Sequence, residues 1–349
     1  MSDQPSRQPY RVEMPPSLAA RVNLAPLRHA AEADVALENL VIRHREFDRL
    51  SDRLAFHHLH YDPSPLREAG VMLVSGMSGA GKSSALKRYA AEFPVQVDKQ
   101  GVRRQVLLVQ VPSGADKHSL QRRILAGLDV PVPRRCTQDE LTLLIDFHLR
   151  AQRVELLILD ESNHLADLKT NDRKFLAADM IKELANFNSC QIVVAGMPSS
   201  MSLLDRNLQL KRRTRLKHAV KAYHWTLDSD RDDYDDFLDA FAEAMPFRRP
   251  PPLSQWSEAL SVASWGLAGI TSLFLVRANG IALEAFEATL KLDHLVVAFD
   301  ELKPSGTRGN PFVSLKSVKF PKRYVDLLVN GIEERSGLRP RKAAAEAAE

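Results

Sequence analysis

A glycine-rich stretch in the first third of the chain carries the residue types that bind a polyphosphate. It fits the pattern G-x-x-x-x-G-K-[ST] at every fixed position, with residues Gly76, Met77, Ser78, Gly79, Ala80, Gly81, Lys82 and Ser83, followed by Ser84. Glycines let backbone N–H groups curl around the anion, and a following helix N-terminus directs its dipole at it. The pattern predicts that Lys82 contacts the β- and γ-phosphates and that Ser83 binds Mg²⁺. A glycine-rich turn without a ligand is the alternative.

The sequence around this stretch has the order that such a site requires. The apolar run 71–75 reads as a buried strand, and 84–90 reads as the start of a helix. A strand, a glycine loop and a helix in this order separate a nucleotide site from a chance match. We therefore expect residues 76–84 to bind ATP together with Mg²⁺.

Two adjacent acids form a second group of residues that could take part in a reaction. The apolar run 156–159 is followed directly by Asp160 and Glu161. Carboxylates at the end of a buried strand lose hydration unless they gain a cationic partner, and Mg²⁺ with a triphosphate provides one. We expect Asp160 to bind the metal, directly or through water, and Glu161 to orient and deprotonate the attacking water. A strand end with two solvated acids is the alternative for this pair alone.

The bulk properties of the chain place few limits on function. Its 349 residues allow about two domains, and its net charge of +4 permits nucleic-acid binding without requiring it. Two cysteines, Cys136 and Cys190, make neither a disulfide framework nor a metal pattern, as expected of reduced cytosolic thiols. The first 28 residues lack the apolar core of a signal peptide, and no run approaches the length of a membrane span. We expect a cytoplasmic protein without a membrane partner.

Strand and helix patterns alternate from residue 71 to about 197. The expected strands are 71–75, 106–111, 154–159 and 191–195, and the expected helices between them are 119–128, 137–149 and 175–187. Nearly continuous apolar strands that alternate with helices predict a parallel sheet covered on both faces. We expect an N-terminal arm and helix at 1–58, an α/β nucleotide-binding core at 59–226, a helical lid at 227–303 and a basic, partly disordered tail at 304–349. The lid pattern suggests a turn near Asn279-Gly280.

Two oppositely charged stretches follow the alternating region. Residues 205–221 are strongly basic, and 228–236 contain six aspartates. Negative charge is favoured at a helix N-terminus, so we interpret the aspartates as the start of a helix rather than as a metal site.

The order of these parts resembles the AAA+ class of ATPases. The resemblance implies a three-layer α/β P-loop fold with a small C-terminal helical lid, and subunits that meet in a ring or spiral with ATP at the interface. A neighbouring subunit would supply an arginine finger, for which Arg212 and Arg213 are the candidates; a basic surface helix is the alternative for both. The segment after the last predicted strand, 196–198, departs from the class because it has no Asn or Thr, and Arg277 is a weak match to the lid arginine. We expect ATP hydrolysis that is slow without partners.

Residues 70 to about 225 more closely resemble the TniB/TnsC-type ATPases of DNA transposition, relatives of the phage Mu target-selection ATPase. The phosphate loop carries this resemblance, together with the D-E-x-x-H-L box from Asp160 to Leu165, the basic segment 209–213 and the lid start 266–269. It implies an ATP-dependent ring or filament on duplex DNA that selects a target, recruits and activates the transposase, and disassembles on hydrolysis. A target-selection protein is a further implied partner. The assembly would be associated with the bacterial nucleoid when active.

DNA contacts in that family come from loops that face the pore of the ring. The candidates in this chain are Lys117, Arg122, Arg123, Arg134, Arg135 and Thr137. Such contacts read backbone shape and charge, so binding is expected to depend on salt. The alternatives are solvated charges for the basic residues and a plain helix N-cap for Thr137. His164 has two readings. It contacts the neighbouring subunit or helps to place Glu161, or else it only packs or caps behind the site.

Two other classes of protein remain as alternatives. A helicase loader would show a clearer lid arginine, and a replication initiator an appended DNA-binding domain; neither is evident in the sequence. A small-molecule P-loop kinase fits less well, because the acid pair and the basic interface segment suit an ATPase that a neighbour completes.

Overall fold

The computed structural model describes residues 31–32, 35–37, 40–62, 68–114, 116–166, 171–198 and 208–322. Its centre is a five-stranded sheet in the order β4-β5-β6-β1-β7, in which every neighbouring pair is parallel. The strands are β1 Val71–Ser75, β4 Val106–Gln110, β5 Leu156–Asp160, β6 Gln191–Gly196 and β7 Thr214–Ala219. The predicted parallel sheet is therefore confirmed, and β6 separates the strand before the glycine loop from the strand before the two acids.

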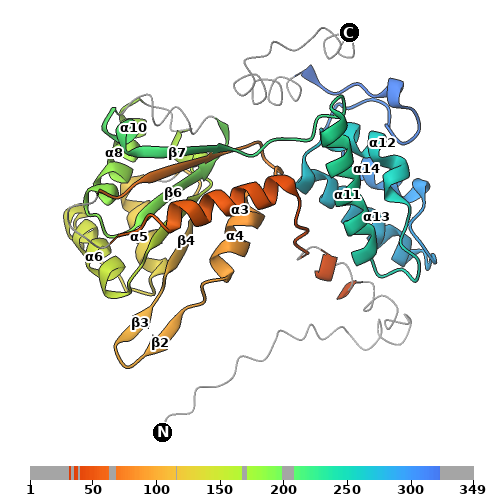
Figure 1. The fold of residues 1–349 in the computed structure, drawn as a ribbon. Helices are drawn as coiled ribbons and strands as arrows, with labels where there is room; N and C mark the ends of the chain where they lie inside the picture. The colour runs from red at the N-terminus through yellow and green to blue at the C-terminus, as the bar shows by residue number, and fades with distance from the viewer. Residues whose placement is uncertain are drawn as a thin grey trace, which may run out of the picture.

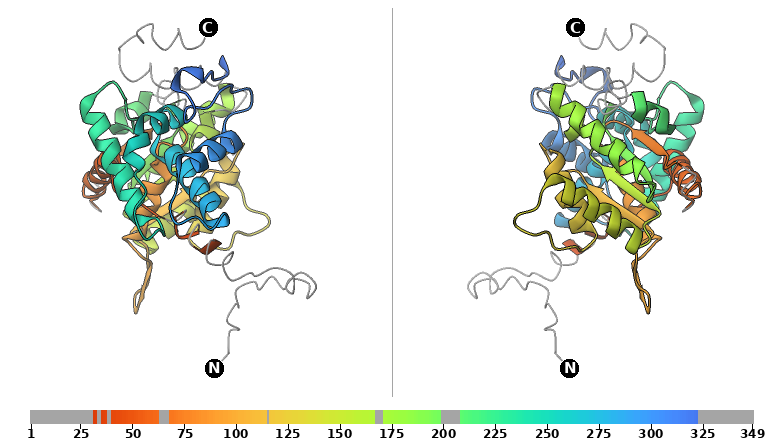
Figure 2. Two further views of the ribbon diagram at one scale, coloured as in Figure 1. Left: turned by 90° about the vertical axis from the view of Figure 1, so that its right-hand side faces the viewer. Right: turned by 90° about the vertical axis from the view of Figure 1, so that its left-hand side faces the viewer.

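Helices cover both faces of this sheet (Figure 1 and Figure 2). One face packs against α3 Arg45–His58 and α4 Lys82–Ala91, and the other against α5 Lys117–Gly127, α6 Gln138–Ala151, α8 Asn171–Asn186 and α10 Leu208–Arg213. Alternate residues of β1, β4, β5 and β6 belong to opposite cores: in β1, Met72 and Val74 pack with the α3–α4 layer, and Leu73 packs with the α5–α6 layer. The strands β1, β5 and β6 are buried along their whole length because both of their faces are covered, whereas the edge strand β7 exposes Arg215 and Lys217.

Local sequence signals fix where two of these helices begin. The side chain of Asp116 accepts a hydrogen bond from Ser119 N, and that of Thr137 accepts one from Glu140 N. Ser119 and Glu140 reciprocate, so both helices start in a capping box. Thr137 is thus the N-cap of α6, as the alternative for this residue stated.

A second group of helices forms a lid beside the sheet (Figure 1). It consists of α11 Asp228–Ala244, the 3-10 turn Leu253–Trp256, α12 Ser257–Ser264, α13 Ala268–Glu284 and α14 Leu292–Leu302. These elements share a hydrophobic core of their own, which includes Tyr234, Phe241 and Phe299. Residues 303–322, with a 3-10 turn at Leu315–Ser317, follow the lid, and Phe312 joins its core.

The lid corrects one prediction and supports another. The turn expected near Asn279-Gly280 is wrong, because both residues lie inside α13 and Asn279 is fully buried. The chain instead turns at residues 265–267, where Gly266 has a φ of 65° and approaches Tyr223 so closely that a Cβ would lie 2.1 Å from the Tyr223 carbonyl oxygen. The aspartate-rich stretch does begin a helix, because α11 starts at Asp228.

Three further features differ from the expected pattern or add to it. The helix predicted within residues 1–58 is interrupted: the described residues 31–32 and 35–37 are helical, residues 40–44 are irregular, and α3 begins at Arg45. Part of the basic segment forms the edge strand β7, which the sequence did not suggest. A hairpin of β2 Gln96–Asp98 and β3 Gly101–Arg103 projects from the core (Figure 1). Residues 1–30 of the predicted arm and residues 323–349 of the predicted tail lie outside the described residues.

Within the part of the chain that the structure describes, no single helix is long and apolar enough to cross a membrane. Among the described residues, the lid segments Leu253–Ser264 and Ala268–Glu284 reach that length and composition only when taken together, and they are bent by 116° relative to each other.

Candidate functional site

The glycine loop joins the carboxyl end of β1 to the N-terminus of α4. Gly79 and Gly81 adopt positive φ values of 77° and 89°, and Gly81 is the N-cap of the helix. Residues with side chains rarely adopt this conformation, so the glycines allow the backbone to curl. The first N–H groups of α4 have no partner within the helix and can bind an anion. The loop thus has the form that binds a polyphosphate.

Lys82 is held at the base of this loop. Its side chain is 7% exposed, and its ammonium group donates to the carbonyl oxygens of Gly76 and Met77 at 2.7 and 2.9 Å. Ser83 follows it in the first turn of α4 and is half-buried. A buried ammonium group needs acceptors, and phosphate oxygens can replace carbonyl oxygens in that role. Lys82 is therefore positioned to exchange loop carbonyls for phosphate.

Asp160 ends β5 on the sheet face that carries α4. Leu156 and Ile158 pack in the same core as Leu86 of α4, and Asp160 continues that alternation. It is 4% exposed, and its carboxylate accepts a hydrogen bond from Glu161 N at 2.9 Å. The structure therefore brings Asp160 and the phosphate loop to the carboxyl end of the strands, on the same face of the sheet.

Glu161 has an unusual backbone. Its φ is 58°, a left-handed conformation that costs a non-glycine residue on the order of 1–3 kcal/mol. The Asp160 carboxylate holds its N–H, and its carbonyl oxygen accepts from His164 N at 3.1 Å. These two hydrogen bonds fix the strained backbone of Glu161 and thereby the orientation of its half-buried side chain. His164 contributes through its backbone N–H.

The donor set at this edge fits Mg²⁺. The ion prefers oxygen ligands, keeps several waters, and is usually held by one or two protein oxygens together with phosphate oxygens. The Ser83 hydroxyl and the Asp160 carboxylate are such oxygens. Among the described residues no three His, Cys, Asp or Glu side chains are grouped as a metal site, so such an ion needs phosphate oxygens and waters as further ligands.

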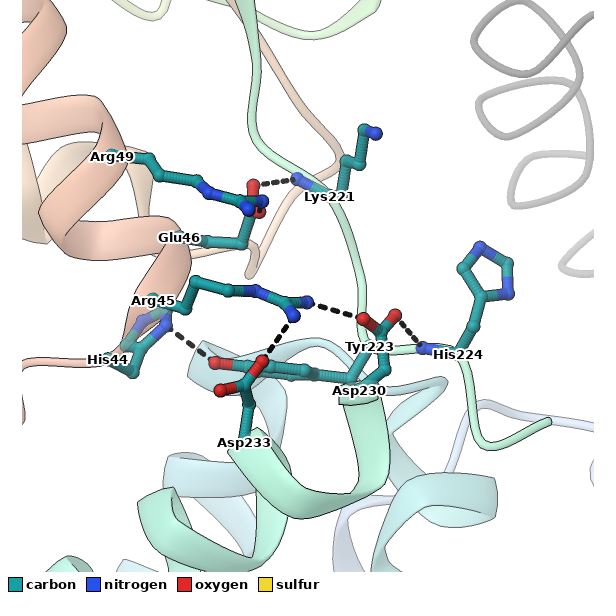
Figure 3. A network of polar contacts seen from close by, with 9 residues as sticks. All are labelled: His44, Arg45, Glu46, Arg49, Lys221, Tyr223, His224, Asp230 and Asp233. Carbon is teal, nitrogen blue, oxygen red and sulfur yellow. Dashed lines mark hydrogen bonds and ion pairs between the residues drawn. The ribbon is translucent and has the colours of Figure 1, made fainter. Parts of the chain in front are cut away.

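The N-terminal segment adds a histidine to the site that the sequence did not indicate. His44 precedes α3, and its Nε2 lies 3.9 Å from where a Cβ on Gly81 would be. Its Nδ1 is 2.9 Å from the hydroxyl oxygen of Tyr223, and Phe237 of the lid packs edge-on against its ring. Burial lowers the pKa of His44, so the ring is neutral at pH 7. A neutral aromatic ring thus lies between Gly81 of the phosphate loop and Phe237 of the lid, and Figure 3 shows its contact with Tyr223.

The residues after His44 bind the lid and the segment that leads to it (Figure 3). Arg45 forms ion pairs with Asp230 and Asp233 of α11. The carboxylate of Glu46, 4% exposed, accepts a hydrogen bond from Lys221 N at 3.1 Å. At the other end of α3, His57 contacts the carbonyl oxygen of Ile192 in the sheet. The helix α3 therefore connects the sheet to the lid.

The lid lies directly on the phosphate loop. The side chain of Ile270, in the first turn of α13, occupies the space beside Gly79, where a Cβ would approach it to 2.6 Å. The weak lid candidate Arg277 lies about 10 Å further along the helix, at 1.5 Å per residue. Arg277 is bound to Glu301 and Glu284, and these partners raise its pKa despite some burial. It is therefore engaged within the lid.

Arg212 and Arg213 lie at the amino end of the parallel strands, whereas the phosphate loop lies at their carboxyl end. They precede Thr214, which pairs with Val71 at the start of β1, whereas the loop follows Ser75. At about 3.3 Å per residue, the start of β1 at Val71 and its end at Ser75 are about 13 Å apart. Arg213 donates to the carbonyl oxygen of Ala185 at 2.9 Å, while Arg212 is exposed and has no ion pair or hydrogen bond within the described residues. Neither side chain belongs to the site of its own chain.

The structure groups most of the candidate DNA contacts beside α5. Hydrogen bonds from Gln121 to the Gln138 carbonyl oxygen and from Arg122 to the Pro133 carbonyl oxygen, at 3.0 and 3.4 Å, hold the α5–α6 loop along α5. Arg134 and Arg135 of that loop are exposed, as is Arg123 of α5. These are the charges available at this surface.

The other two candidates have partners within the chain. The ammonium group of Lys117 lies 2.7 Å from the carboxylate of Glu183, and Thr137 caps α6. Each would have to exchange that partner to contact DNA.

Comparison with known proteins places this geometry in a family. The family model described as "Bacterial TniB protein" matches residues 34–224, more than half of the chain. This chain belongs to the TniB family. The matched region includes His44, the phosphate loop, the acid pair and Arg212, and it ends before the lid helices. The family resemblance expected from the sequence is confirmed. No curated protein matches the TniB-family sequence.

Solved structures show the same fold. The Aeropyrum pernix ORC2 protein (ADPNP-ADP complexes) is 16% identical with a TM-score of 0.54, covering 73% of this chain and 67% of its own. The Aeropyrum pernix ORC1 protein in complex with DNA is 20% identical with a TM-score of 0.53, covering 75% and 66%. Cdc6p from Pyrobaculum aerophilum is 16% identical with a TM-score of 0.54, covering 75% and 68%. The TniB-family chain thus has an AAA+ fold with a C-terminal helical lid, as predicted, and spans about two thirds of each neighbour.

Proposed function

We propose that this chain is an ATPase that assembles on duplex DNA and uses ATP hydrolysis as a switch in transposition. The observation that carries the proposal is the meeting of the phosphate loop and the Asp160–Glu161 pair at one edge of the sheet, in a member of the TniB family. The fold neighbour solved with ADPNP and ADP supports nucleotide binding, and the neighbour solved with DNA supports DNA association.

ATP would bind with its phosphates in the loop at residues 76–83. Lys82 would exchange its two loop carbonyls for oxygens of the β- and γ-phosphates, and Ser83 and Asp160 would hold Mg²⁺. The bound ion would offset negative charge on the phosphate oxygens. The neutral ring of His44 suits the uncharged base of the nucleotide better than a further phosphate.

Hydrolysis would require a water beside the γ-phosphate. Glu161 would accept a proton from this water as its oxygen forms a bond to the γ-phosphorus. The bond from that phosphorus to the oxygen shared with the β-phosphate then breaks, which gives ADP and inorganic phosphate. The strained backbone at Glu161 supports this role, since such conformations cluster at active sites.

A neighbouring subunit would complete the site. Arg212 is exposed at the amino end of the strands, away from its own phosphate loop at their carboxyl end. It can therefore neutralise phosphate charge only in another copy. Contacts between two different surfaces of identical chains are head-to-tail, and they generate rings or helical filaments. We therefore propose a homo-oligomeric ring or filament with ATP between subunits.

DNA would contact the surface formed by α5 and the α5–α6 loop. Arg123, Arg134 and Arg135 are exposed there and can contact phosphates without reading bases. We propose that the assembly marks a DNA target and recruits the transposase, with a target-selection protein as a further partner, and that it works in the bacterial cytoplasm on the nucleoid.

Imaging by negative-stain electron microscopy tests this proposal. The full chain would be mixed with duplex DNA, with and without a non-hydrolysable ATP analogue. Rings or filaments on DNA that require the analogue are the expected result. Particles that respond to neither ligand would overturn it.

A second candidate function is that of a replication-initiator or helicase-loader relative. The likeness to ORC and Cdc6 proteins favours it at the level of fold. The family match favours transposition. A transposase gene beside the gene for this chain would support the first reading, and specific binding to origin DNA would support the second.

A further inference from the structure

The end of β6 lies between the two halves of the candidate site. Gly196, its last residue, pairs with Ser75 at the end of β1, and its carbonyl oxygen accepts from Gly76 N at 3.1 Å. On its other side, the carbonyl oxygen of Ala195 accepts from Ser162 N at 2.8 Å. Any side chain at this point would lie between the phosphate loop and the loop that carries Glu161.

Gly196 has no side chain there, and its conformation does not explain why. Its φ is not in the left-handed region, so its backbone does not require glycine. The reason is space: a Cβ would lie 2.6 Å from the Ser162 hydroxyl oxygen, 2.9 Å from Asn163 N and 3.2 Å from Asn163 Oδ1. Ser162, which follows the acid pair, and Asn163, the first residue of α7 Asn163–Ala166, already fill the place.

Asn163 brings an unsatisfied acceptor to this place. Its side chain is 5% exposed, and its Oδ1 has no hydrogen-bond partner within the described residues. The hydroxyl of Ser162 is also unpartnered, but that residue is fully enclosed. Buried carbonyl oxygens are almost always paired, so an exception calls for an explanation such as a ligand or an ordered water.

The chemistry of hydrolysis supplies a ligand that needs such an acceptor. A water that attacks phosphorus through its oxygen has two O–H groups. Glu161 accepts one of them, and the second requires another acceptor if the water is to keep a fixed orientation. Asn163 lies two residues after Glu161, beside the strand end that contacts the phosphate loop.

We propose that Asn163 Oδ1 accepts a hydrogen bond from the attacking water and so orients it toward the γ-phosphate. This role rests on the ATP hydrolysis proposed above. It makes Asn163 a second water ligand, supplied by the start of α7 after β5 because β6 ends in glycine.

Two variants of Asn163 test the role. Asn163→Ala truncates the amide, and Asn163→Leu keeps its branched shape but removes both polar atoms. Each should lower kcat about 100-fold because the water loses its orientation. The dissociation constant for ATP should change less than about threefold, because the phosphates keep their other ligands. The unfolding free energy should equal or exceed that of the unaltered chain, because an unpaired buried group is removed.

Ser162→Ala is the matched control, since it removes the neighbouring unpaired oxygen, and it should leave kcat unchanged. Unaltered kcat in a folded Asn163 variant would overturn the proposal, as would a loss of stability that accounts for the loss of activity. Glu161→Gln separates this failure from that of the proposed function. If the unaltered chain hydrolyses ATP and Glu161→Gln does not, an active Asn163→Ala refutes only the role of Asn163.

Discussion

The backbone N–H of Gly269, in the first turn of α13, donates a hydrogen bond to the carbonyl oxygen of Gly79 at 2.8 Å. Gly79 is part of the phosphate loop, so the lid is joined to the loop by main-chain contact and not only by side-chain packing. A change in the loop on nucleotide binding must therefore reach α13 directly. The position of the lid becomes a consequence of what the loop binds.

Gly269→Ala should weaken ATP binding about tenfold, which corresponds to about 1.4 kcal/mol. A Cβ there would lie 2.7 Å from the Gly79 carbonyl oxygen, so lid and loop must separate. Ser272→Ala, which loses only a hydrogen bond to Ala268 within the same helix, is the control. Calorimetric titration with ATP measures both. Equal affinities for the two variants would show that the lid contact is not part of the nucleotide site.

Lys82→Ala and Glu161→Gln should separate binding from hydrolysis. The lysine variant loses the charge that faces the phosphates, so nucleotide and DNA binding should be lost together. The glutamine variant keeps the binding groups but lacks the base, so it should trap the DNA-bound form. Nucleotide titration, DNA gel shift and phosphate release measure these properties. Normal hydrolysis by Glu161→Gln would refute its assignment as the base.

Arg212→Ala and Arg213→Ala should fail in different ways. The exposed Arg212 should be dispensable for stability but required for hydrolysis, with kcat lowered about 1,000-fold. Arg213 binds the Ala185 carbonyl oxygen, so its loss should cost about 1–3 kcal/mol of unfolding free energy. Lys217→Ala, an exposed cation on β7, is the control for charge. Hydrolysis by Arg212→Ala should recover in part when it is mixed with Lys82→Ala, because an interface whose phosphate loop comes from Arg212→Ala and whose Arg212 comes from Lys82→Ala is intact.

Stability should fall as pH decreases from 7 to 5, in part because of His57. Burial lowers the pKa of this histidine to about 4, partly opposed by its hydrogen bond to the Ile192 carbonyl oxygen. The unfolded chain binds the proton from pH 6.5 downward while the folded chain does not, so protonation favours unfolding. The loss attributable to His57 is about 2 kcal/mol across this interval. Urea unfolding of His57→Gln should show a pH dependence smaller by that amount; an unchanged slope would refute the assignment.

The double variant Arg134→Ala/Arg135→Ala should weaken DNA binding and reduce its salt dependence. Each lost phosphate contact lowers the slope of log K against log salt by about 0.9, so the expected change is about 1.8. Lys117→Ala, whose parent side chain is paired with Glu183, should change the slope less. Fluorescence anisotropy at several salt concentrations measures both. Equal slopes for the double variant and the unaltered chain would exclude this surface.

The sequence predicts those parts of the site that local pattern determines. The phosphate loop, the strand before Asp160 and the capping box at Thr137 are visible because each depends on neighbours within a few residues. The edge strand β7 is not visible. Only one of its faces packs against the protein, and its exposed Arg215 and Lys217 interrupt any apolar run, as is common for strands that must resist edge pairing.

Long-range packing decides the remaining features. An Asn-Gly pair is a strong turn signal, but burial of Asn279 in the lid core holds residues 279–280 in a helix. The sequence shows that Gly196 lacks a polar side chain; it cannot show that Asn163, three residues after the end of the neighbouring strand β5, fills the same space. The contacts of His44 with Gly81 and Tyr223 likewise have no local signature.

The helix α3 has a consequence for how the chain is made. It leaves the ribosome before the whole core, yet its partners are distant: Tyr89 is 31 residues after His58, Ile192 is 135 after His57, and Asp230 is 185 after Arg45. The helix can dock its two ends only once the sheet and α11 have been synthesised. Long loop closure of this kind slows folding. The first described long helix to be translated is therefore among the last to be fixed, and until then the surfaces that it covers remain open to chaperones and proteases.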